Sequence, residues 1–357
     1  MLRKDLRRRG RRGKLTAMTP TSSVSPSPTC WVVTDGAAGA ENQCLGLAEA
    51  LATTPTVKRI QVRAPWRWLP PELWPNPLAA LSGEGDTLRP PWPQLVIGSG
   101  RKAAAPVAAV KRAAPESFAV QVQDPRMPPE MFDAIVAPNH DEMAGPNVIC
   151  TTGALNRVTS QRLAAAREAF AETVRDLPAP RIAVLVGGRS RGFDLAVARA
   201  RRLGRDIAAL CARTGGGAMV TTSRRTPDNA AAALRRSLSG QPALVWQPGR
   251  DPEPNPYMGF LGWADHVMVT EDSITMLSEA AGTGRPVHVL PMDGGRAKFA
   301  RFQRELTDLG IARSFDGSLP TWSYTSLNEA QRVARILRGW MDGGGTRTPR
   351  RAAAASG

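Results

Sequence analysis

The chain has 357 residues, of which 42% are hydrophobic and 22% charged, with a formal net charge of +16 at pH 7. One hydrophobic core stops growing at about 250 to 300 residues, so two domains are expected, and the near-average composition excludes wholesale disorder. The first 17 residues carry +7 of this charge and the last 11 carry +3, so much of it lies in the tails. Only 5% of the residues are aromatic. Both observations argue against nucleic-acid binding, because base stacking needs aromatic side chains among the basic ones.

The four cysteines lie far apart, without a C-x-x-C pair, at Cys30, Cys44, Cys150 and Cys211. This pattern predicts neither a zinc site nor a disulfide framework. No stretch approaches the ~18 to 20 apolar residues of a membrane-spanning helix, and the basic start lacks the apolar segment of a secretory signal. We therefore expect a cytoplasmic protein with disordered tails at residues 1–29 and 343–357.

The first half alternates short apolar runs with helical patterns, which predicts a parallel β-sheet covered by helices. Strands are expected at Trp31–Thr34, Val57–Val62, Leu95–Ile97, Phe118–Val122 and Ile135–Ala137, and helices at Glu41–Leu51 and Lys102–Ala113. A further helical pattern from Leu155 to Arg175 ends before Pro178 and Pro180. Since prolines end helices, we place a domain boundary there, with residues 30–177 as the first domain.

A segment rich in tryptophan and proline, residues 64–93, interrupts this alternation and contains Trp66, Trp68 and Trp74. Tryptophan beside arginine prefers a bilayer interface. The segment therefore either touches the inner membrane peripherally or packs onto its own domain.

The second half, residues 178–325, repeats the alternation. Strands are expected at Ile182–Val186, Ala218–Thr222, Ala243–Trp246, His266–Val269 and Val287–Leu290. Helices are expected at Phe193–Arg213, Asp228–Leu238, Ile274–Ala281 and Lys298–Leu309, and a last helix, Ser326–Met341, occupies residues 326–342. The sequence thus predicts an α/β fold with two Rossmann-like domains that face each other across a cleft.

The loop after the first strand begins with Asp35, Gly36 and Gly39 and leads into a helix. Such a loop presents unpaired backbone N–H groups and the positive end of a helix dipole. Glu41, Asn42 and Gln43 follow, and their side chains either bind sugar hydroxyls or cap the helix.

A similar loop opens the second half, with Gly187, Gly188 and Arg189 directly after a strand. Glycines there let the backbone approach a ligand, and the arginine can meet a phosphate, although a simple turn is the alternative. Thr222, Ser223 and Arg224 follow the next strand, at the carboxyl edge where open α/β sheets bind ligands.

The segment from Glu271 to Pro291 carries the most specific signal. Ser273 can cap a helix whose first N–H groups would hold a diphosphate, and Glu279, nearly two turns on, can accept hydrogen bonds from a ribose diol. Thr275 and Ser278 add hydroxyls to the same helix. A capped surface helix is the alternative, but it does not explain this clustering of hydroxyls.

These residues resemble the donor-site signature of GT-B glycosyltransferases of the cell-envelope, lipid-linked type. More closely, the stretch from Cys30 to Met341 resembles the mitochondrial fission "elongated mitochondria" family, which has many bacterial members. The resemblance rests on several motifs in order, namely DGAAGAENQ from Asp35, IGSG at 97–100 with Arg101, QDPR at 123–126, PNHD at 138–141, VGG at 186–188, TTSRRTP at 221–227, NPYMGFL at 255–261 and TEDSITMLSEA at 270–280.

The resemblance implies a GT-B fold and leaves two functions open. The first is a metal-independent glycosyltransferase that uses a nucleotide-diphosphate sugar on an envelope acceptor, with no further cofactor. The second is a non-catalytic scaffold that binds a protein partner. For the transferase, Ser99, Arg101 and Asp124 join the acceptor side. The candidate bases are Asp35, Glu41, Asp124 and His140, with His140 preferred because it follows a predicted strand of the acceptor half.

Two other enzyme classes are disfavoured by missing motifs. A GT-A transferase needs a D-x-D metal clamp, and the chain contains none. An epimerase of the short-chain dehydrogenase type needs a Tyr-x-x-x-Lys pair. Here Leu261 and Asn328 stand four residues after the two tyrosines, Tyr257 and Tyr324.

Overall fold

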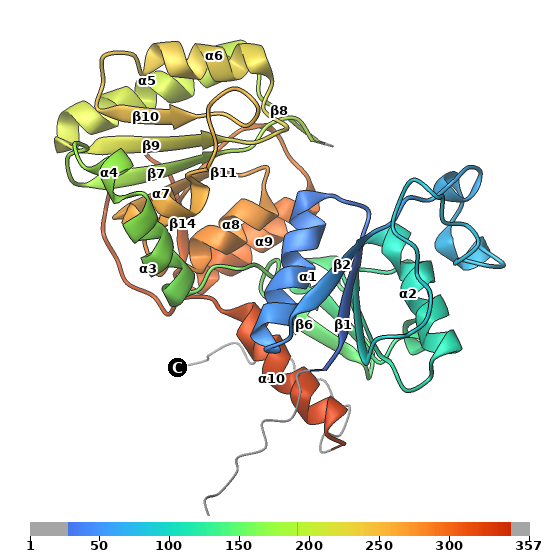
Figure 1. Cartoon of the computed structure of the whole chain (residues 1–357). Helices are drawn as coiled ribbons and strands as arrows, with labels where there is room; N and C mark the ends of the chain where they lie inside the picture. Colours follow the sequence, from blue (N-terminus) through green and yellow to red (C-terminus); the bar gives the residue numbers. More distant parts are fainter. Residues whose placement is uncertain (1–27, 191, 344–357) are drawn as a thin grey trace, which may run out of the picture.

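The computed structural model describes residues 28–190 and 192–343. The two tails expected from the sequence lie outside this range except at their inner ends. The predicted fold class is confirmed, since each half is an α/β unit built on a six-stranded parallel sheet (Figure 1).

The first sheet has the strand order β2-β1-β3-β4-β5-β6, and all its pairs are parallel. Its strands are β1 (Cys30–Thr34), β2 (Pro55–Arg59), β3 (Leu95–Ser99), β4 (Phe118–Val122), β5 (Ala134–Pro138) and β6 (Val148–Thr151). Helix α1 (Ala38–Ala50) covers one face, while α2 (Arg101–Ala113) covers the other. Because both faces are covered, the inner strands are buried apolar runs, as parallel sheets require.

The last helix, α10 (Glu329–Met341), completes the core of this first half. Its residues Val333 and Leu337 lie in the same buried cluster as Leu47 of α1 and Ile97 of β3. The Arg338 guanidinium also donates to the carbonyl of Ala50 at 2.5 Å. The chain therefore returns from the second half to the first before it ends (Figure 1).

The second sheet has the order β10-β9-β7-β11-β12-β14. Its strands are β7 (Arg181–Val186), β9 (Gly217–Thr222), β10 (Ala243–Trp246), β11 (His266–Thr270), β12 (Val287–Leu290) and β14 (Ala312–Ser314). One face packs on α5 (Val197–Thr214) and α6 (Asp228–Ser237). The other packs on α7 (Tyr257–Trp263), α8 (Ile274–Ala281) and α9 (Ala297–Asp308).

Along the chain, the two sheets are joined through two short helices, α3 (Ser160–Ala169) and α4 (Ala171–Val174), and α3 packs against α7. The expected continuous helix from Leu155 is therefore wrong at its start and is broken at Phe170. Thr159 begins α3 instead, because its side chain accepts a hydrogen bond from the Arg162 N–H and so caps the helix.

Three further expectations need correction. Phe193 and Asp194 form the strand β8, which pairs with β13 (Asp293–Gly294), so α5 starts only at Val197. The edge strands β6 and β14 and the helix α7 were not predicted. The final helix begins at Glu329 rather than Ser326, capped by Asn328.

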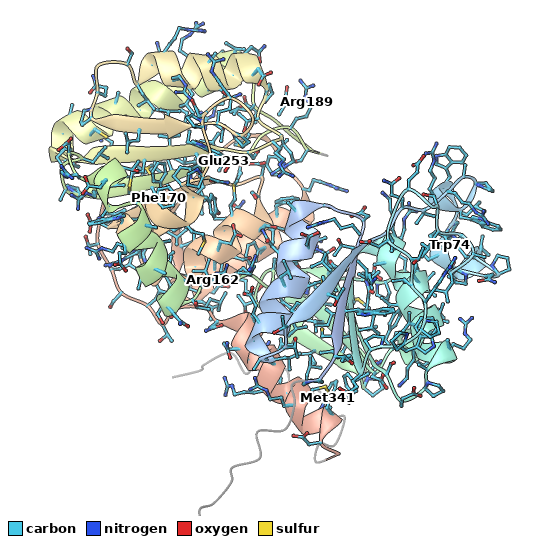
Figure 2. The ribbon with its side chains drawn as sticks, in the orientation of Figure 1. Trp74, Arg162, Phe170, Arg189, Glu253 and Met341 are labelled. Carbon is cyan, nitrogen blue, oxygen red and sulfur yellow. The ribbon has the colours of Figure 1, made fainter. Side chains whose placement is uncertain are left out.

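The tryptophan-rich segment projects from the first half as a loop with two 3-10 turns, η1 (Trp66–Trp68) and η2 (Pro71–Leu73) (Figure 1). Trp74 is buried against Ala105 of α2, where Figure 2 labels it. The expected membrane contact by Trp74 is therefore wrong, since its ring already packs on the domain. Trp68 is 64% exposed and Leu73 is 59% exposed.

The two halves meet where the 3-10 turn η4 (Asn139–Asp141) contacts α9. Lys298 and Arg301 of α9 form ion pairs with Asp141 and Glu142, at 2.5 and 3.2 Å. In the part of the chain that the structure describes, no helix has both the length and the apolar character needed to cross a membrane.

Candidate functional site

Three loops of the second half meet at one edge of its sheet. They follow β7, β9 and β11, which are neighbours in the order β9-β7-β11. Because parallel strands present their carboxyl ends at the same edge, residues 187–188, 223–226 and 271–273 come together there. This is the edge where open α/β sheets bind ligands.

Asp272 ties these three loops together. Its carboxylate accepts from the Gly188 N–H at 3.0 Å and from the Thr270 hydroxyl at 2.7 Å. The Arg225 guanidinium lies 2.9 Å from the same carboxylate, whose side chain is 0% exposed. A buried carboxylate needs such partners, because an unpaired charge in the interior is costly.

The turn after β7 needs glycine at position 187. A Cβ built on Gly187 would lie 2.1 Å from Oδ1 of Asp272, closer than any real contact. The Gly187 N–H donates to the Thr270 hydroxyl at 2.7 Å, and its carbonyl accepts from Thr226. The absence of a side chain therefore lets the loop after β7 lie directly on Asp272.

Two hydroxyls at the end of β9 have no hydrogen-bond partner among the described residues. They belong to Thr221 and Thr222, which are both buried. A buried hydroxyl left unsatisfied costs about 1 to 3 kcal/mol. As neighbours in a strand they point to opposite faces of the sheet, Thr221 with Met219 to the face that packs on α7 and α8, and Thr222 with Val220 to the face that packs on α5.

Helix α8 begins at the same edge. Ser273 caps it by accepting from the Met276 N–H at 3.3 Å. Thr275 in its first turn faces the first half, since a Cβ built on Gly39 would lie 4.0 Å from the Thr275 hydroxyl oxygen. The predicted donor helix and the predicted DGAAG loop are thus brought side by side.

Ser278 has a different surrounding from its neighbours on this helix. It is fully buried, and its hydroxyl donates to the Ile274 carbonyl and accepts from the Ala154 N–H at 2.9 Å. The Asn156 side chain donates to the Ser278 carbonyl at 3.2 Å. Ser278 therefore holds the two halves together, and its hydroxyl is already occupied.

Glu279 is bonded to a tyrosine of α7. The Tyr257 hydroxyl donates to its Oε2 at 2.5 Å, which leaves Oε1 for another donor. Burial raises the pKa of Glu279 to about 7. Burial and the nearby Glu279 carboxylate together raise the pKa of Tyr257 well above its usual value, so this hydroxyl keeps its proton.

The acidic candidates of the first half are engaged in ion pairs. Asp35 lies 3.0 Å from the ammonium of Lys102, and Glu41 lies 2.7 Å from the guanidinium of Arg59. The hydrogen bonds from Arg59 hold the pKa of Glu41 below its usual value. The Asp35 side chain is 28% exposed against 15% for Glu41, so it is the more accessible carboxylate.

His140 lies inside the contact between the halves. Its ring is buried and meets the Phe302 ring edge-on, with the centroids 5.2 Å apart. Burial, together with the charges of Lys298 and Arg301, lowers the pKa of His140 to about 4. The imidazole is therefore neutral at physiological pH and packs as part of the interface.

The remaining acceptor-side candidates gather at the carboxyl edge of the first sheet, because β1, β3 and β4 are neighbours. Gly36 adopts a positive φ of 80° after β1, and Gln43 bonds back to the Gly39 carbonyl at 3.3 Å. Ser99 is buried beside the thiol of Cys44. The other three candidates are the half-buried Asn42, the exposed Arg101 and Asp124, which pairs with Arg126 at 2.9 Å.

Two predicted phosphate ligands point outward. Arg189 pairs with Asp194 at 3.3 Å, and Figure 2 shows it on the loop that projects beside β8. Arg224 is also exposed. The arginine directed into the site is the next residue, Arg225. Arg224 and Arg225 are the central residues of a turn that the Thr226 N–H closes by donating to the Ser223 carbonyl at 3.0 Å, and Arg225 is the one that reaches Asp272.

Sequence reasoning therefore missed Asp272, Thr270 and Tyr257 as site residues. A signal existed for Asp272, because a carboxylate two residues after the last strand residue can reach back to the neighbouring glycine loop. Nothing in the sequence pairs Tyr257 with Glu279, since they lie 22 residues apart and meet only through the packing of α7 against α8.

Comparison with known proteins agrees with this architecture. The model of the family described as Mitochondrial fission ELM1 matches residues 38–341. The chain is 32% identical over 281 residues to the mitochondrial fission protein ELM1 of Arabidopsis thaliana. That match covers 70% of this chain and 65% of the plant protein, so the chain spans just under two thirds of its length.

A bacterial relative and a solved structure extend the comparison. An uncharacterised protein of Rickettsia prowazekii is 27% identical over 289 residues, which cover 69% of this chain and 79% of that protein. The UDP-GlcNAc 2-epimerase of Methanocaldococcus jannaschii superposes with a TM-score of 0.52 at 12% identity, covering 87% of this chain and 99% of the epimerase. At this identity the likeness concerns the fold alone.

Proposed function

The chain belongs to the mitochondrial fission ELM1 family, and we propose that it binds a nucleotide-diphosphate sugar and transfers the sugar without a metal ion. The family name describes a cellular process rather than a reaction. The proposal therefore rests on the chemistry of the edge formed by β9, β7 and β11, together with a fold that is also found in a UDP-GlcNAc 2-epimerase.

The observation that carries the proposal is the buried Asp272 beside unsatisfied hydroxyls. Asp272 fixes the Gly187–Gly188 loop and holds Arg225 at the rim of the site. The start of α8 adds free backbone N–H groups and the positive end of its dipole. This combination of backbone donors and a guanidinium suits a diphosphate, which can then leave without a metal.

The other parts of a nucleotide find partners on either side. The Oε1 atom of Glu279 can accept from a ribose diol while Oε2 stays bonded to Tyr257. The hydroxyl of Thr221, on the face of β9 that packs on α7 and α8, can bond to the base or the ribose. The sugar would then extend toward Gly39, which lies across from Thr275.

The acceptor would bind along residues 35–43 of the first half, together with Ser99, Arg101 and Asp124. Its hydroxyl attacks the anomeric carbon, the bond to the diphosphate breaks, and a base takes the hydroxyl proton. We assign the base to Asp35, because Glu41 is held by Arg59 and His140 is buried. The Lys102 ammonium lies 3.0 Å from the Asp35 carboxylate and holds it in position.

Binding is tested by thermal unfolding with UDP, GDP, ADP, CDP and dTDP and with the matching sugar nucleotides. A ligand at one hundred times its Kd stabilises the folded state by about 2.7 kcal/mol. We expect one base to give this shift, and Glu279→Ala and Arg225→Ala to abolish it. Glu168→Ala, an exposed carboxylate on α3, is the control. If no nucleotide stabilises the protein, the proposal is wrong.

A second candidate function is a scaffold that binds a nucleotide sugar and a protein partner without turnover. It is favoured by the ion pairs of Asp35 and Glu41 and by the burial of His140, because each of these three candidate bases is then already engaged or covered. If the protein releases nucleoside diphosphate from the sugar nucleotide that stabilises it, and Asp35→Asn loses this release, the result supports the transferase. Binding without any release supports the scaffold.

The location that fits a lipid-linked envelope acceptor is the cytoplasmic face of the inner membrane. Trp68 and Leu73 lie exposed on the projecting loop, and the Arg67 guanidinium stacks 4.5 Å from the Trp68 ring centroid. Trp66 packs partly against the domain. Aromatic and apolar side chains beside arginine are typical of peripheral contact with anionic lipid.

A further inference from the structure

The hydroxyl of Tyr257 is presented by a tightly packed helix. Tyr257 is the first residue of α7, which lies between α3 on one side and β7 and β9 on the other. A Cβ built on Gly259 of α7 would lie 2.5 Å from the Phe170 ring. At the other end of α7, the Trp263 indole N–H donates to the Arg167 carbonyl of α3 at 2.7 Å. These contacts fix α7, and with it the place of the Tyr257 hydroxyl.

Glu279 stands on a helix that is fixed as firmly. The preceding residue, Ser278, accepts from the Ala154 N–H at 2.9 Å, and its carbonyl accepts from the Asn156 side chain at 3.2 Å. The Tyr257 hydroxyl donates to Oε2 of Glu279 at 2.5 Å. Among the described residues, Oε1 has no hydrogen-bond partner, and it reaches the surface. The pair therefore presents one free carboxylate oxygen in a set direction.

Oε1 of Glu279 has room for two donors. An ionised carboxylate has about four lone-pair positions, two on each oxygen. No arginine or lysine among the described residues forms an ion pair with Glu279. A ligand that covers Oε1 removes it from water, and each lone pair then left unmet weakens binding. Two neighbouring hydroxyls satisfy Oε1, whereas a single hydroxyl leaves one position empty.

We infer that the Tyr257–Glu279 pair makes the site select ribonucleoside diphosphates over their 2′-deoxy counterparts, with Tyr257 as the positioning residue. The inference rests on the proposed function, in which Glu279 meets the ribose. The 2′ and 3′ hydroxyls of a ribose both donate to Oε1, while a 2′-deoxyribose offers the 3′ hydroxyl alone. The donor is therefore a sugar linked to UDP, GDP, ADP or CDP, and a dTDP-sugar is rejected.

Titration calorimetry on the full chain at pH 8 tests the selectivity, because Glu279 is ionised above its pKa, which burial raises to about 7. UDP, GDP, ADP and CDP are each compared with the 2′-deoxy form. For whichever base binds, we expect the ribose form to bind about ten- to a hundredfold more tightly, the range for a hydrogen bond to a charged group. Equal binding of the two forms overturns the inference and leaves the nucleotide site standing, whereas no binding of any of them contradicts the proposed function as well.

Tyr257→Phe tests the positioning role, since it keeps the ring and removes the hydroxyl. Two bonds to one oxygen need a fixed carboxylate, whereas a single bond tolerates rotation. We therefore expect the ribose form to lose about tenfold in affinity and the deoxyribose form less than about threefold. Tyr324→Phe is the matched control, because this tyrosine packs against the same core cluster and its hydroxyl donates to the Arg285 carbonyl at 2.8 Å.

The ratio of the two affinities separates this role from a merely structural one. A fall of the ratio in Tyr257→Phe, with no change in Tyr324→Phe, supports the inference. An unchanged ratio in Tyr257→Phe, even at lower stability, overturns it. Glu279→Gln keeps the size of the side chain and removes its charge, so it should reduce the ratio to less than about threefold. It gives the same decision if Tyr257→Phe does not fold.

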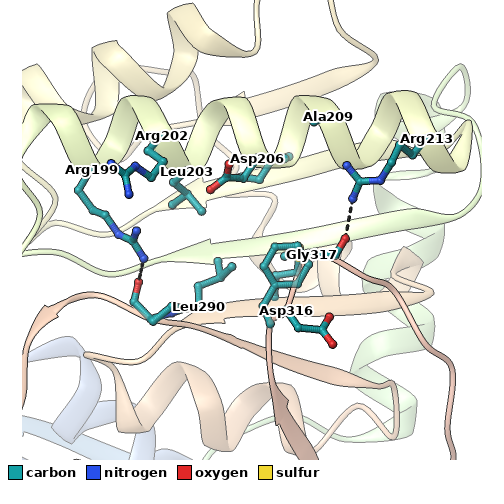
Figure 3. Close-up of a pocket in the computed structure, with 13 residues that line it drawn as sticks. Arg199, Arg202, Leu203, Asp206, Ala209, Arg213, Leu290, Asp316 and Gly317 are labelled. Atoms are coloured by element: carbon teal, nitrogen blue, oxygen red, sulfur yellow. Dashed lines mark hydrogen bonds between the residues drawn. The ribbon is translucent and has the colours of Figure 1, made fainter.

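A cavity of about 450 Å³ beside α5 is another place where an anionic ligand can bind (Figure 3). Its rim carries Arg199 and Arg202 together with Asp206. The cavity lies on the face of the second sheet opposite α7 and α8. Arg202→Ala should therefore leave the ratio unchanged. A ratio that changes in Arg202→Ala and not in Tyr257→Phe overturns the inference, because the nucleotide then lies beside α5.

Discussion

Replacing Gly187 by alanine tests whether the buried carboxylate of Asp272 organises the site. The new Cβ would lie 2.1 and 2.2 Å from the two carboxylate oxygens, so Asp272 must move. Movement weakens its bonds to the Gly188 N–H and Thr270 and its pairing with Arg225. Breaking the partners of a buried charge costs about 3 to 5 kcal/mol, and overpacking alone costs about 1 to 3 kcal/mol.

We therefore expect Gly187→Ala to lower the free energy of unfolding of the second half by about 3 kcal/mol. For a domain of this size the melting temperature would fall by roughly 6 to 12 °C. Urea unfolding followed by tryptophan fluorescence measures the loss directly. Gly83→Ala is the matched control, because a Cβ there meets nothing within 4 Å and its backbone needs no positive φ.

A double-mutant cycle isolates the cause. Asp272→Ala removes the carboxylate that the new methyl group would strike, so adding Gly187→Ala to it should cost less than about 1 kcal/mol. If Gly187→Ala alone costs less than about 0.5 kcal/mol, or if the two changes add fully, Asp272 does not fix this loop and the reasoning fails.

Three further predictions concern the replacement of one or two side chains. Glu279 has its pKa raised to about 7 from 4.5, so the folded state binds its proton more tightly and loses stability as the pH rises from 4.5 to 7. In urea unfolding, Glu279→Gln should therefore raise the free energy of unfolding by about 1 to 3 kcal/mol at pH 8 and leave it unchanged at pH 4. An equal effect at the two pH values would contradict this prediction. Ser278→Ala should cost about 1 to 3 kcal/mol, since it leaves the buried Ala154 N–H without its acceptor; a change within error would show that this bond contributes nothing. Replacing Trp68 and Leu73 by alanine should reduce sedimentation with anionic vesicles about tenfold at unchanged stability, and undiminished binding would exclude this loop as the contact.

The sequence predicted five strands of each sheet, including the edge strands β2 and β10, and missed β6 and β14 at the opposite edges. The inner strands stood out as apolar runs because both faces of a parallel sheet are covered. Strand β6 has four residues and β14 has three, of which Ala312 is the one that is buried. Phe193 was assigned to a helix because β8 is a strand only through its pairing with β13, in which Phe193 lies opposite Gly294, far away in the sequence.

The candidate site was predictable in its backbone and less so in its side chains. Glycines and helix starts follow strand ends in the sequence, so Gly187, Gly188 and Ser273 could be placed at one edge. The partners of each charge depend on tertiary packing. Arg225 rather than Arg224 faces Asp272, and Glu279 meets Tyr257, because of local backbone direction and helix contacts that no spacing rule contains.

The return of α10 to the first half has a consequence for synthesis. A ribosome releases the first sheet long before it makes Val333 and Leu337, which complete the core around Leu47. The nascent first half must therefore wait with an uncovered apolar surface until the whole second half has emerged. Chains interrupted after β14 would keep that surface exposed and would therefore be prone to aggregate.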